Sequence, residues 1–366
     1  MVRGLGRALR FRKGWNNPAL EVRESEVEVS CRNGTVPATL LLPPGGTPPF
    51  PGWVTLHGIT RPGRSHPTLL RFVRALAYSG SAVLLPEIQE WTELDLAPKS
   101  AGQVLEGAVL TLAGREEVDG ARVGAIGFSF GAPQVLLAAS HPELSRHLKA
   151  VVGFGSYAEL EATLRFMFFG EHELNGTRFK VDPDPYGRWV VAGNYLTRAP
   201  GYEDSADVAE ALLRLARAAG DQQVGAWEDV YEALKDELAL EVEPARHSLF
   251  RALAASGAVT DSEASLEGLV HGLARTATRI SPILDFRSRL EDLAVPVRLI
   301  HGRQDRLIPF SETVKLAQSL PPSADSKVFL TGMFSHSQPD SARARLGEMR
   351  ERVWFIYLMA EILGLL

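Results

Sequence analysis

The segment GFSFG sets Ser129 between Gly127 and Gly131, after an apolar run at 122–126 and before an alanine- and leucine-rich run at 132–140. The two runs predict a strand before the serine and a helix after it. A G-x-S-x-G turn between a strand and a helix is sharp, and its glycines leave room where side chains would collide with neighbouring backbone. The serine hydroxyl then stands at the carboxyl end of the sheet, where open α/β folds bind ligands. Ser129 is therefore the candidate nucleophile.

A serine hydroxyl attacks a carbonyl only when a base takes its proton and a third group orients that base. Asp305 follows a predicted strand at 295–302, and His336 follows the next predicted strand at 325–332. Because parallel strands end at the same edge of a sheet, residues that follow these strands can meet near the serine. We predict that Ser129, Asp305 and His336 form a catalytic triad.

Other acidic and histidine residues have simpler interpretations. Asp292 precedes its strand and is less well placed than the aspartate that follows it. We expect His301, at the end of that strand, to stabilise the loop that carries Asp305, and we expect His57 to structure the loop after an earlier strand. Surface or packing roles are expected for the histidines at 141, 147, 172, 247 and 271.

The elements that must position these residues follow from the order of strand-like and helical patterns. Residues 22–42 predict a hairpin with an Asn-Gly turn, and strands and helices then alternate along the chain. Such alternation is typical of an α/β fold with a mostly parallel sheet flanked by helices. The alternation stops across 156–285, which contain helical stretches and few strand-like runs. We therefore predict a core domain of residues 1–155 and 286–366 with a mainly helical insertion.

The chain resembles the α/β-hydrolase superfamily in four segments, LHGIT, GFSFG, HGRQD and FSHS. The resemblance covers residues 1–155 and 286–366 and is nearest to serine hydrolases of the dienelactone-hydrolase and prolyl-oligopeptidase types. It implies the order nucleophile, acid, base that Ser129, Asp305 and His336 show. It also implies an α/β-hydrolase fold in which the insertion, a cap or lid, follows the sixth core strand.

The superfamily holds the oxyanion of its tetrahedral intermediate with two backbone N–H groups. One belongs to the residue after the nucleophile, which is Phe130 in this chain. The second comes from the loop after the third strand, where Ile59 is the candidate and Thr60 lies behind it. The resemblance therefore implies an oxyanion hole formed by the backbones of Phe130 and Ile59.

Serine at the elbow implies an acyl-enzyme, whereas the aspartate of related epoxide hydrolases and haloalkane dehalogenases forms an alkyl ester. The expected activity is that of a carboxylesterase acting on a small-molecule ester, with no cofactor and no metal. A membrane-associated lipase or thioesterase and an acyl-peptide or amide hydrolase remain as alternatives. A non-catalytic binding protein is disfavoured because the elbow glycines and all three triad residues are present.

The substrate pocket is expected to involve the insertion. Residues 164–174 hold a dense aromatic group, and residues 186–196 form a second candidate lid surface. An apolar lid would favour small or medium hydrophobic esters. The pocket residues predicted from these stretches are Phe166, Phe169 and Trp189. Two basic residues that could receive a substrate carboxylate are Arg178 and Arg188.

Composition limits the remaining function classes. A net charge of −5 argues against nucleic-acid binding. Cys31 is the only cysteine, which excludes an internal disulfide, and we expect a cytoplasmic protein. The basic N-terminal residues 1–13 are expected to form a solvated arm or first turn, although a helix on a membrane surface is an alternative. The apolar C-terminus at 353–366 predicts a buried closing helix. The sequence leaves the oligomeric state open.

Overall fold

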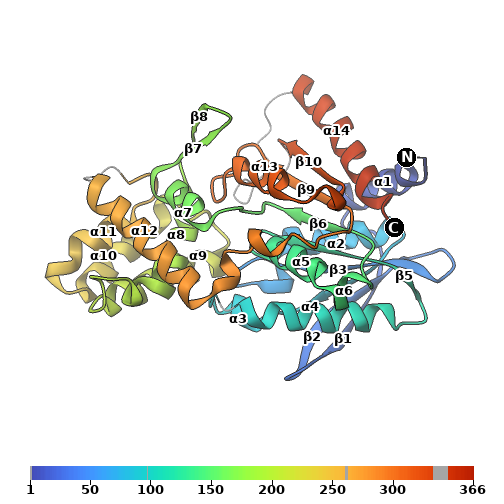
Figure 1. Ribbon diagram of the computed structural model, residues 1–366, viewed down its shortest axis with the longest axis horizontal. Helices are drawn as coiled ribbons and strands as arrows, with labels where there is room; N and C mark the ends of the chain where they lie inside the picture. Colours follow the sequence, from blue (N-terminus) through green and yellow to red (C-terminus); the bar gives the residue numbers. More distant parts are fainter. Residues whose placement is uncertain (1, 97, 260–262, 333–344) are drawn as a thin grey trace.

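The computed structural model describes residues 2–96, 98–259, 263–332 and 345–366 (Figure 1). In this described part of the chain, eight strands form one sheet in the order β1-β2-β4-β3-β5-β6-β9-β10. The strands are β1 (Arg23–Cys31), β2 (Gly34–Leu42), β3 (Phe50–Leu56), β4 (Ala82–Pro86), β5 (Val118–Phe128), β6 (Val151–Phe154), β9 (Val297–Gly302) and β10 (Ser326–Thr331).

The sheet is antiparallel at one edge and parallel elsewhere. β1 and β2 form the predicted hairpin, in which Cys31 pairs with Gly34 across the turn, and β2 runs antiparallel to β4. From β4 to β10 every neighbouring pair is parallel. The carboxyl ends of β3, β5 and β9 therefore lie at one edge of the sheet, where the loops with the candidate residues begin.

Alternating side chains give the sheet two apolar faces. On β4, Val83 and Leu85 join the core cluster of one face, whereas Ala82 and Leu84 join the cluster of the other. Buried residues of three helices complete the first cluster: α1 (Val2–Asn16), α2 (Pro67–Tyr78) and α14 (Arg345–Leu363). Three others complete the second: α4 (Pro98–Ala113), α5 (Gly131–Ser140) and α13 (Phe310–Ser319). Two short helices, α3 (Gln89–Thr92) and α6 (Pro142–Ser145), lie in connections.

Between β6 and β9 the chain forms a lobe at one end of the sheet (Figure 1), which we call the helical segment, residues 160–289. Its apolar residues belong to the same continuous cluster as the second face of the sheet. Its elements are α7 (Leu160–Phe169), β7 (Glu171–Leu174), β8 (Thr177–Lys180), α8 (Tyr186–Tyr195), α9 (Ala206–Gln222), α10 (Glu232–Glu241), α11 (His247–Ala254) and α12 (Glu263–Ile280).

The N-terminal residues form helix α1 and not the solvated arm that the sequence favoured. Ala8 and Phe11 are fully buried, and the ring of Phe11 lies 5.3 Å from that of Phe72 and 5.9 Å from that of Phe355. The sequence did not reveal this packing, because α1 has many basic residues and only a few apolar ones, which recur at helical intervals. α14 is the predicted closing helix. No helix in the described ranges is both long and apolar enough to cross a membrane.

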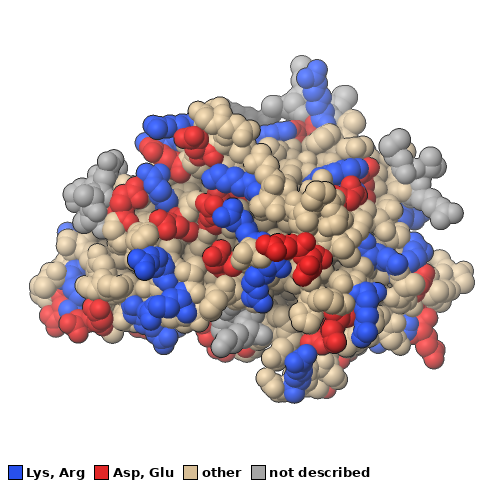
Figure 2. Space-filling view, in the orientation of Figure 1, with Lys and Arg blue, Asp and Glu red and all other residues tan. Residues whose placement is uncertain are grey.

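Charges of both signs are interspersed over the face of the molecule shown in Figure 2, consistent with the small net charge of −5. Many form surface ion pairs, such as Arg165 with Glu267 and Arg214 with Glu241. Exposed pairs of this kind contribute little to stability, about 0–1 kcal/mol each. The fold is therefore held chiefly by the two apolar clusters.

Candidate active site

Ser129 occupies the turn between β5 and α5 in a strained backbone conformation, with φ of 51°. Its N–H donates to the Phe154 carbonyl at 2.7 Å, and its own carbonyl accepts from the Ala132 N–H at 2.9 Å. A Cβ at Gly127 would collide with the carbonyl of Gly131, so the turn closes only with glycine there. The predicted strand–turn–helix is confirmed. Because φ of this sign is rare for residues other than glycine, a serine here points to a function.

Asp305 lies on the loop after β9 and is 4% exposed. Its Oδ1 accepts hydrogen bonds from the N–H groups of Leu307 at 2.9 Å and Ile308 at 3.0 Å. The Nε2 of His301 lies 2.8 Å from the Ile308 carbonyl and 3.4 Å from Asp305 Oδ2, and its Nδ1 lies 2.7 Å from the hydroxyl of Thr313. The expectation that His301 stabilises this loop is confirmed.

The loop after β10 begins beside the loop that carries Asp305. Thr331, the last residue of β10, pairs with Gly302, and its carbonyl accepts from the N–H of Arg303 at 2.8 Å. His336 itself falls in 333–344, outside the described residues. Its role as the catalytic base therefore stays a prediction.

The loop after β3 passes directly beside the nucleophile. A Cβ at Gly58 would lie 3.1 Å from the Cβ of Ser129. Ile59 and Phe130 both line the same cavity as the serine. Within the described ranges, neither residue's backbone N–H donates to another group. The oxyanion hole formed by these two amides stays a prediction.

His57, which the sequence predicted to structure this loop, does so together with Glu87, a carboxylate that the sequence analysis did not single out. His57 is 1% exposed, with Nδ1 2.7 Å from the Gly58 carbonyl and Nε2 accepting from the Ile88 N–H at 3.1 Å. Glu87 Oε1 lies 3.1 Å from the same Nε2. Burial alone would raise the pKa of Glu87, but His57 and Arg64 outweigh burial and hold it below its usual value. The sequence indicated a role for Glu87 only through its position directly after β4.

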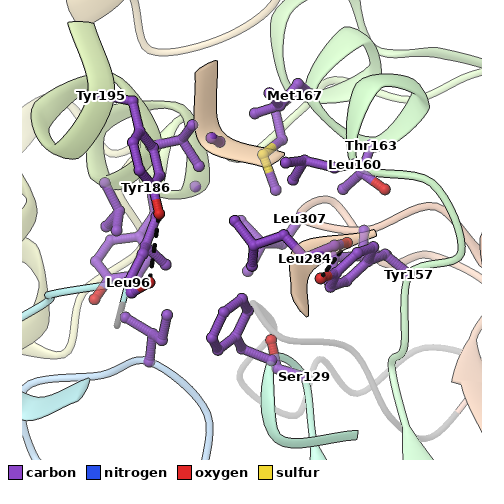
Figure 3. Close-up of a pocket in the computed structure, with 18 residues that line it drawn as sticks. Leu96, Ser129, Tyr157, Leu160, Thr163, Met167, Tyr186, Tyr195, Leu284 and Leu307 are labelled. Atoms are coloured by element: carbon purple, nitrogen blue, oxygen red, sulfur yellow. Dashed lines mark hydrogen bonds between the residues drawn. The ribbon is translucent and has the colours of Figure 1, made fainter. Parts of the chain in front are cut away.

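An apolar cavity of about 80 Å³ opens beside Ser129. In Figure 3, Ser129 lies at its base, with Tyr186 and Tyr195 on one side and Tyr157 and Thr163 on the other. The core contributes Ile59, Leu96, Ser129, Phe130, Tyr157, Leu307 and Ile308 to the lining. The helical segment contributes Leu160, Thr163, Leu164, Met167, Tyr186, Gly187, Val190, Val191, Tyr195, Ala277 and Leu284.

The three residues predicted for the pocket do not line this cavity, and that prediction was wrong. Phe166 is fully buried with its ring 5.5 Å from that of His172, and Trp189 is fully buried with its ring 6.3 Å from that of Tyr231. Phe169 is also absent from the lining and packs against the core cluster. Successive helical residues point about 100° apart, so near neighbours on the same helices supply the lining instead.

Arg188 also differs from its expected role. Its side chain is fully buried and donates to backbone carbonyls of Met167, Leu253, Ala255 and Gly257. Burial lowers the pKa of Arg188 to about 9. Because its donors are used by these carbonyls, this guanidinium holds helices of the helical segment together and does not face the cavity. Arg178 lies on the exposed β7–β8 hairpin.

Acyl transfer uses groups of these kinds, together with a base, for which the predicted residue His336 lies outside the described residues. A strained serine faces an apolar cavity, two backbone amides lie beside it, and a buried carboxylate occupies the neighbouring loop. Among the described residues, no three histidine, cysteine, aspartate or glutamate side chains lie close enough together to hold a metal ion.

No family model and no curated protein matches the chain. Several solved structures do match the chain. One of two fungal esterases from Rhizomucor miehei aligns with a TM-score of 0.51 at 16% identity, covering 96% of this chain and 88% of that one. Brefeldin A esterase, a bacterial homologue of human hormone-sensitive lipase, aligns with a TM-score of 0.49 at 16% identity, covering 99% and 84%. Dienelactone hydrolase from Anabaena variabilis aligns with a TM-score of 0.43 at 16% identity, covering 92% and 99%.

The likeness to the fungal esterase, together with the strand order, defines the fold: the chain has the α/β-hydrolase fold, with a mostly parallel eight-stranded sheet across the residues described. The predicted fold class is confirmed. At such low identity the alignments support no substrate, so activity must be argued from the site.

Proposed function

We propose that the protein is a serine hydrolase that cleaves carboxylic esters of small molecules through an acyl-enzyme. The strained backbone of Ser129 at the carboxyl end of β5, on the wall of an apolar cavity, carries this proposal. Such strain costs of order 1–3 kcal/mol and persists where it serves a site. The hydrogen bonds that hold Asp305 and the position of Phe130 and Ile59 on the same cavity add support.

In this mechanism Ser129 Oγ attacks the ester carbonyl while His336 takes the hydroxyl proton. Asp305 orients the imidazole and stabilises the imidazolium, and the N–H groups of Phe130 and Ile59 hold the oxyanion. The intermediate then expels the alcohol, which receives the proton from His336. Water repeats the sequence on the acyl-enzyme, releases the carboxylic acid and restores the serine.

Residues 156–285 are the cap in this proposal, and residues 1–155 and 286–366 are the catalytic core. The cavity wall supports this division because residues on both sides of these boundaries line it. Its apolar character favours esters with a hydrophobic acyl or alcohol group. The cap therefore selects the substrate, and the core performs the chemistry.

The first test is covalent labelling by a fluorophosphonate, read by intact mass. The reagent mimics the tetrahedral intermediate, so it labels a serine only where a base and an oxyanion hole activate it. We expect one adduct on the wild type and none on Ser129→Ala, together with a loss of esterase activity of about 10³-fold or more. Ser140→Ala, a buried serine on the helix that follows the elbow, is the matched control and should label like the wild type.

A folded wild type that forms no adduct would refute the proposal. If the wild type is labelled, kcat/KM for an ester, a thioester and an amide with the same acyl group distinguishes the carboxylesterase from the thioesterase and the amide hydrolase. All three share the triad chemistry and differ only in the leaving group. Higher kcat/KM for an amide or a thioester than for the ester would replace the carboxylesterase by that alternative.

A further inference from the structure

Tyr186 carries a polar group that the proposed mechanism does not use. It begins α8 and lines the cavity beside Ser129 (Figure 3). Its hydroxyl oxygen is buried and has no hydrogen-bond partner among the described residues. A buried hydroxyl without a partner destabilises a fold, and a phenylalanine would avoid that cost. Within the described part of the chain, this hydroxyl is therefore available to a group that enters the cavity.

The other two tyrosines of the cavity show the ordinary arrangement. The hydroxyl of Tyr157 donates to the Leu284 carbonyl at 3.1 Å, and that of Tyr195 donates to the Leu96 carbonyl at 3.4 Å. These contacts tie the walls of the cavity together. The Tyr186 hydroxyl has no such contact, although it shares the same apolar surroundings.

A trapped water is a poor partner for this hydroxyl. Buried waters make about three hydrogen bonds to polar groups. The remaining lining is mainly apolar, and the hydroxyl of Thr163 already donates to the Glu159 carbonyl at 2.8 Å. Burial and the carboxylate of Asp184 raise the pKa of the Tyr186 phenol above its usual value, so the group stays protonated and can donate.

We propose that Tyr186 determines specificity by donating a hydrogen bond to an oxygen atom of the substrate group that enters the cavity. A cavity of about 80 Å³ has room for about six water-sized groups, so that substrate group is short. The substrate class is then a short-chain ester with an ether, carbonyl or hydroxyl oxygen beyond the reacting carboxyl. This inference rests on the proposed esterase function.

The test compares pairs of esters in which one oxygen replaces one methylene. On the acyl side these are p-nitrophenyl pentanoate and p-nitrophenyl β-methoxypropanoate, and on the alcohol side butyl butanoate and methoxyethyl butanoate. In Tyr186→Phe we expect the ratio of kcat/KM, ether ester over alkyl ester, to fall about 5- to 10-fold in one of the two series. Tyr231→Phe is the control, because this tyrosine lies outside the cavity lining and its hydroxyl donates to the Val224 carbonyl at 3.0 Å; its ratio should equal that of the wild type.

Thermal unfolding gives a readout that is independent of activity. Tyr186→Phe should have a melting temperature equal to that of the wild type or about 1–3 °C higher, because it removes an unpartnered polar group. Tyr157→Phe should melt lower, because it leaves the Leu284 carbonyl without its donor.

Two results would overturn the inference. The first is an ether-to-alkyl ratio that is unchanged in both ester series, even where both esters lose activity equally. The second is a lower melting temperature for Tyr186→Phe than for the wild type. The fluorophosphonate adduct separates these failures from a failure of the proposed function. If the wild type is labelled but the ratio is unchanged in Tyr186→Phe, only the proposed role of Tyr186 is refuted. If the wild type is not labelled, the esterase proposal itself is refuted.

Discussion

At the scale of single residues, the candidate site depends on backbone positions that only particular side chains tolerate. Ser129 has a positive φ, and the glycines on either side of it face backbone with no room for a methyl group. The backbone around Asp305 is fixed by two N–H groups and by His301. Preorganised groups of this kind need little rearrangement when charge develops in a transition state.

Gly127→Ala tests the steric argument at the elbow. Its Cβ would collide with the Gly131 carbonyl, so we expect a loss of about 1–3 kcal/mol of unfolding free energy and a fluorophosphonate labelling rate at least about 10-fold lower. Gly102→Ala is the control, because its Cβ in α4 has no neighbour within 4 Å. That control should be neutral or stabilising. Wild-type labelling by Gly127→Ala would contradict the argument.

At the scale of secondary structure, the β7–β8 hairpin is an element that the sequence analysis missed. Asn175 and Gly176 both have positive φ, as a two-residue hairpin turn requires, and the Asn-Gly pair was its available signal. The hairpin packs through His172 and Phe179, whose rings stack 4.9 Å apart, against Phe310. Strands of four residues with many charges have too little apolar alternation to stand out.

We expect the free energy of unfolding to depend on pH through His172 of this hairpin. Burial, with smaller contributions from Lys315 and His301, lowers the pKa of His172 to about 4. Because the unfolded chain binds this proton near pH 6.5, stability is full above that pH and is lost as pH falls from about 6.5 toward 4. We expect a loss of about 1–2 kcal/mol after solvent screening.

Urea unfolding at several values between pH 7 and pH 4 measures this effect. His172→Phe keeps an aromatic ring and removes the titrating group, so its unfolding free energy should fall less over this range than that of the wild type. Equal slopes in both proteins would show that the imidazole does not control stability in this window.

At the scale of the whole molecule, contacts between distant segments join the functional loops to the helical segment and the first helix to the last. Arg61, on the loop after β3, pairs with Asp221 of α9 at 2.9 Å, and Arg306, next to the candidate acid, pairs with Asp182 at 2.8 Å. At the other side of the sheet, Arg7 of α1 donates to carbonyls at the carboxyl end of α14.

The contact between α1 and α14 can be tested with two glycines of α1, one at the contact and one away from it. A Cβ at Gly4 would collide with the carbonyl of Ala360, whereas a Cβ at Gly6 would meet nothing within 4 Å. Gly4→Ala should lower the unfolding free energy by about 1–3 kcal/mol, because the two helices must separate. Gly6→Ala should raise it by about 0.5–1 kcal/mol through helix propensity. Chemical denaturation measures both, and equal effects would contradict this packing.

The sequence by itself determined the features that follow from local sterics and periodicity. The elbow around Ser129 could be predicted because a sharp turn between strand and helix needs glycine on both sides of it. The order of strands and helices, and the loop that carries Asp305, followed from alternating apolar runs. Each of these features is encoded within about ten residues, so tertiary contacts were not needed to recognise it.

The tertiary structure alone decided which apolar side chains face the cavity and which fill the core. Burial in a core and burial around a ligand require the same residue types, so sequence could not separate Phe166 and Trp189 from the true lining. It also decided the partner of each charged group. Arg188 binds backbone carbonyls, and α1 packs on α14, because these neighbours come from segments far apart in the chain. Local pattern shows that a face is apolar, but only the assembled fold determines what covers it.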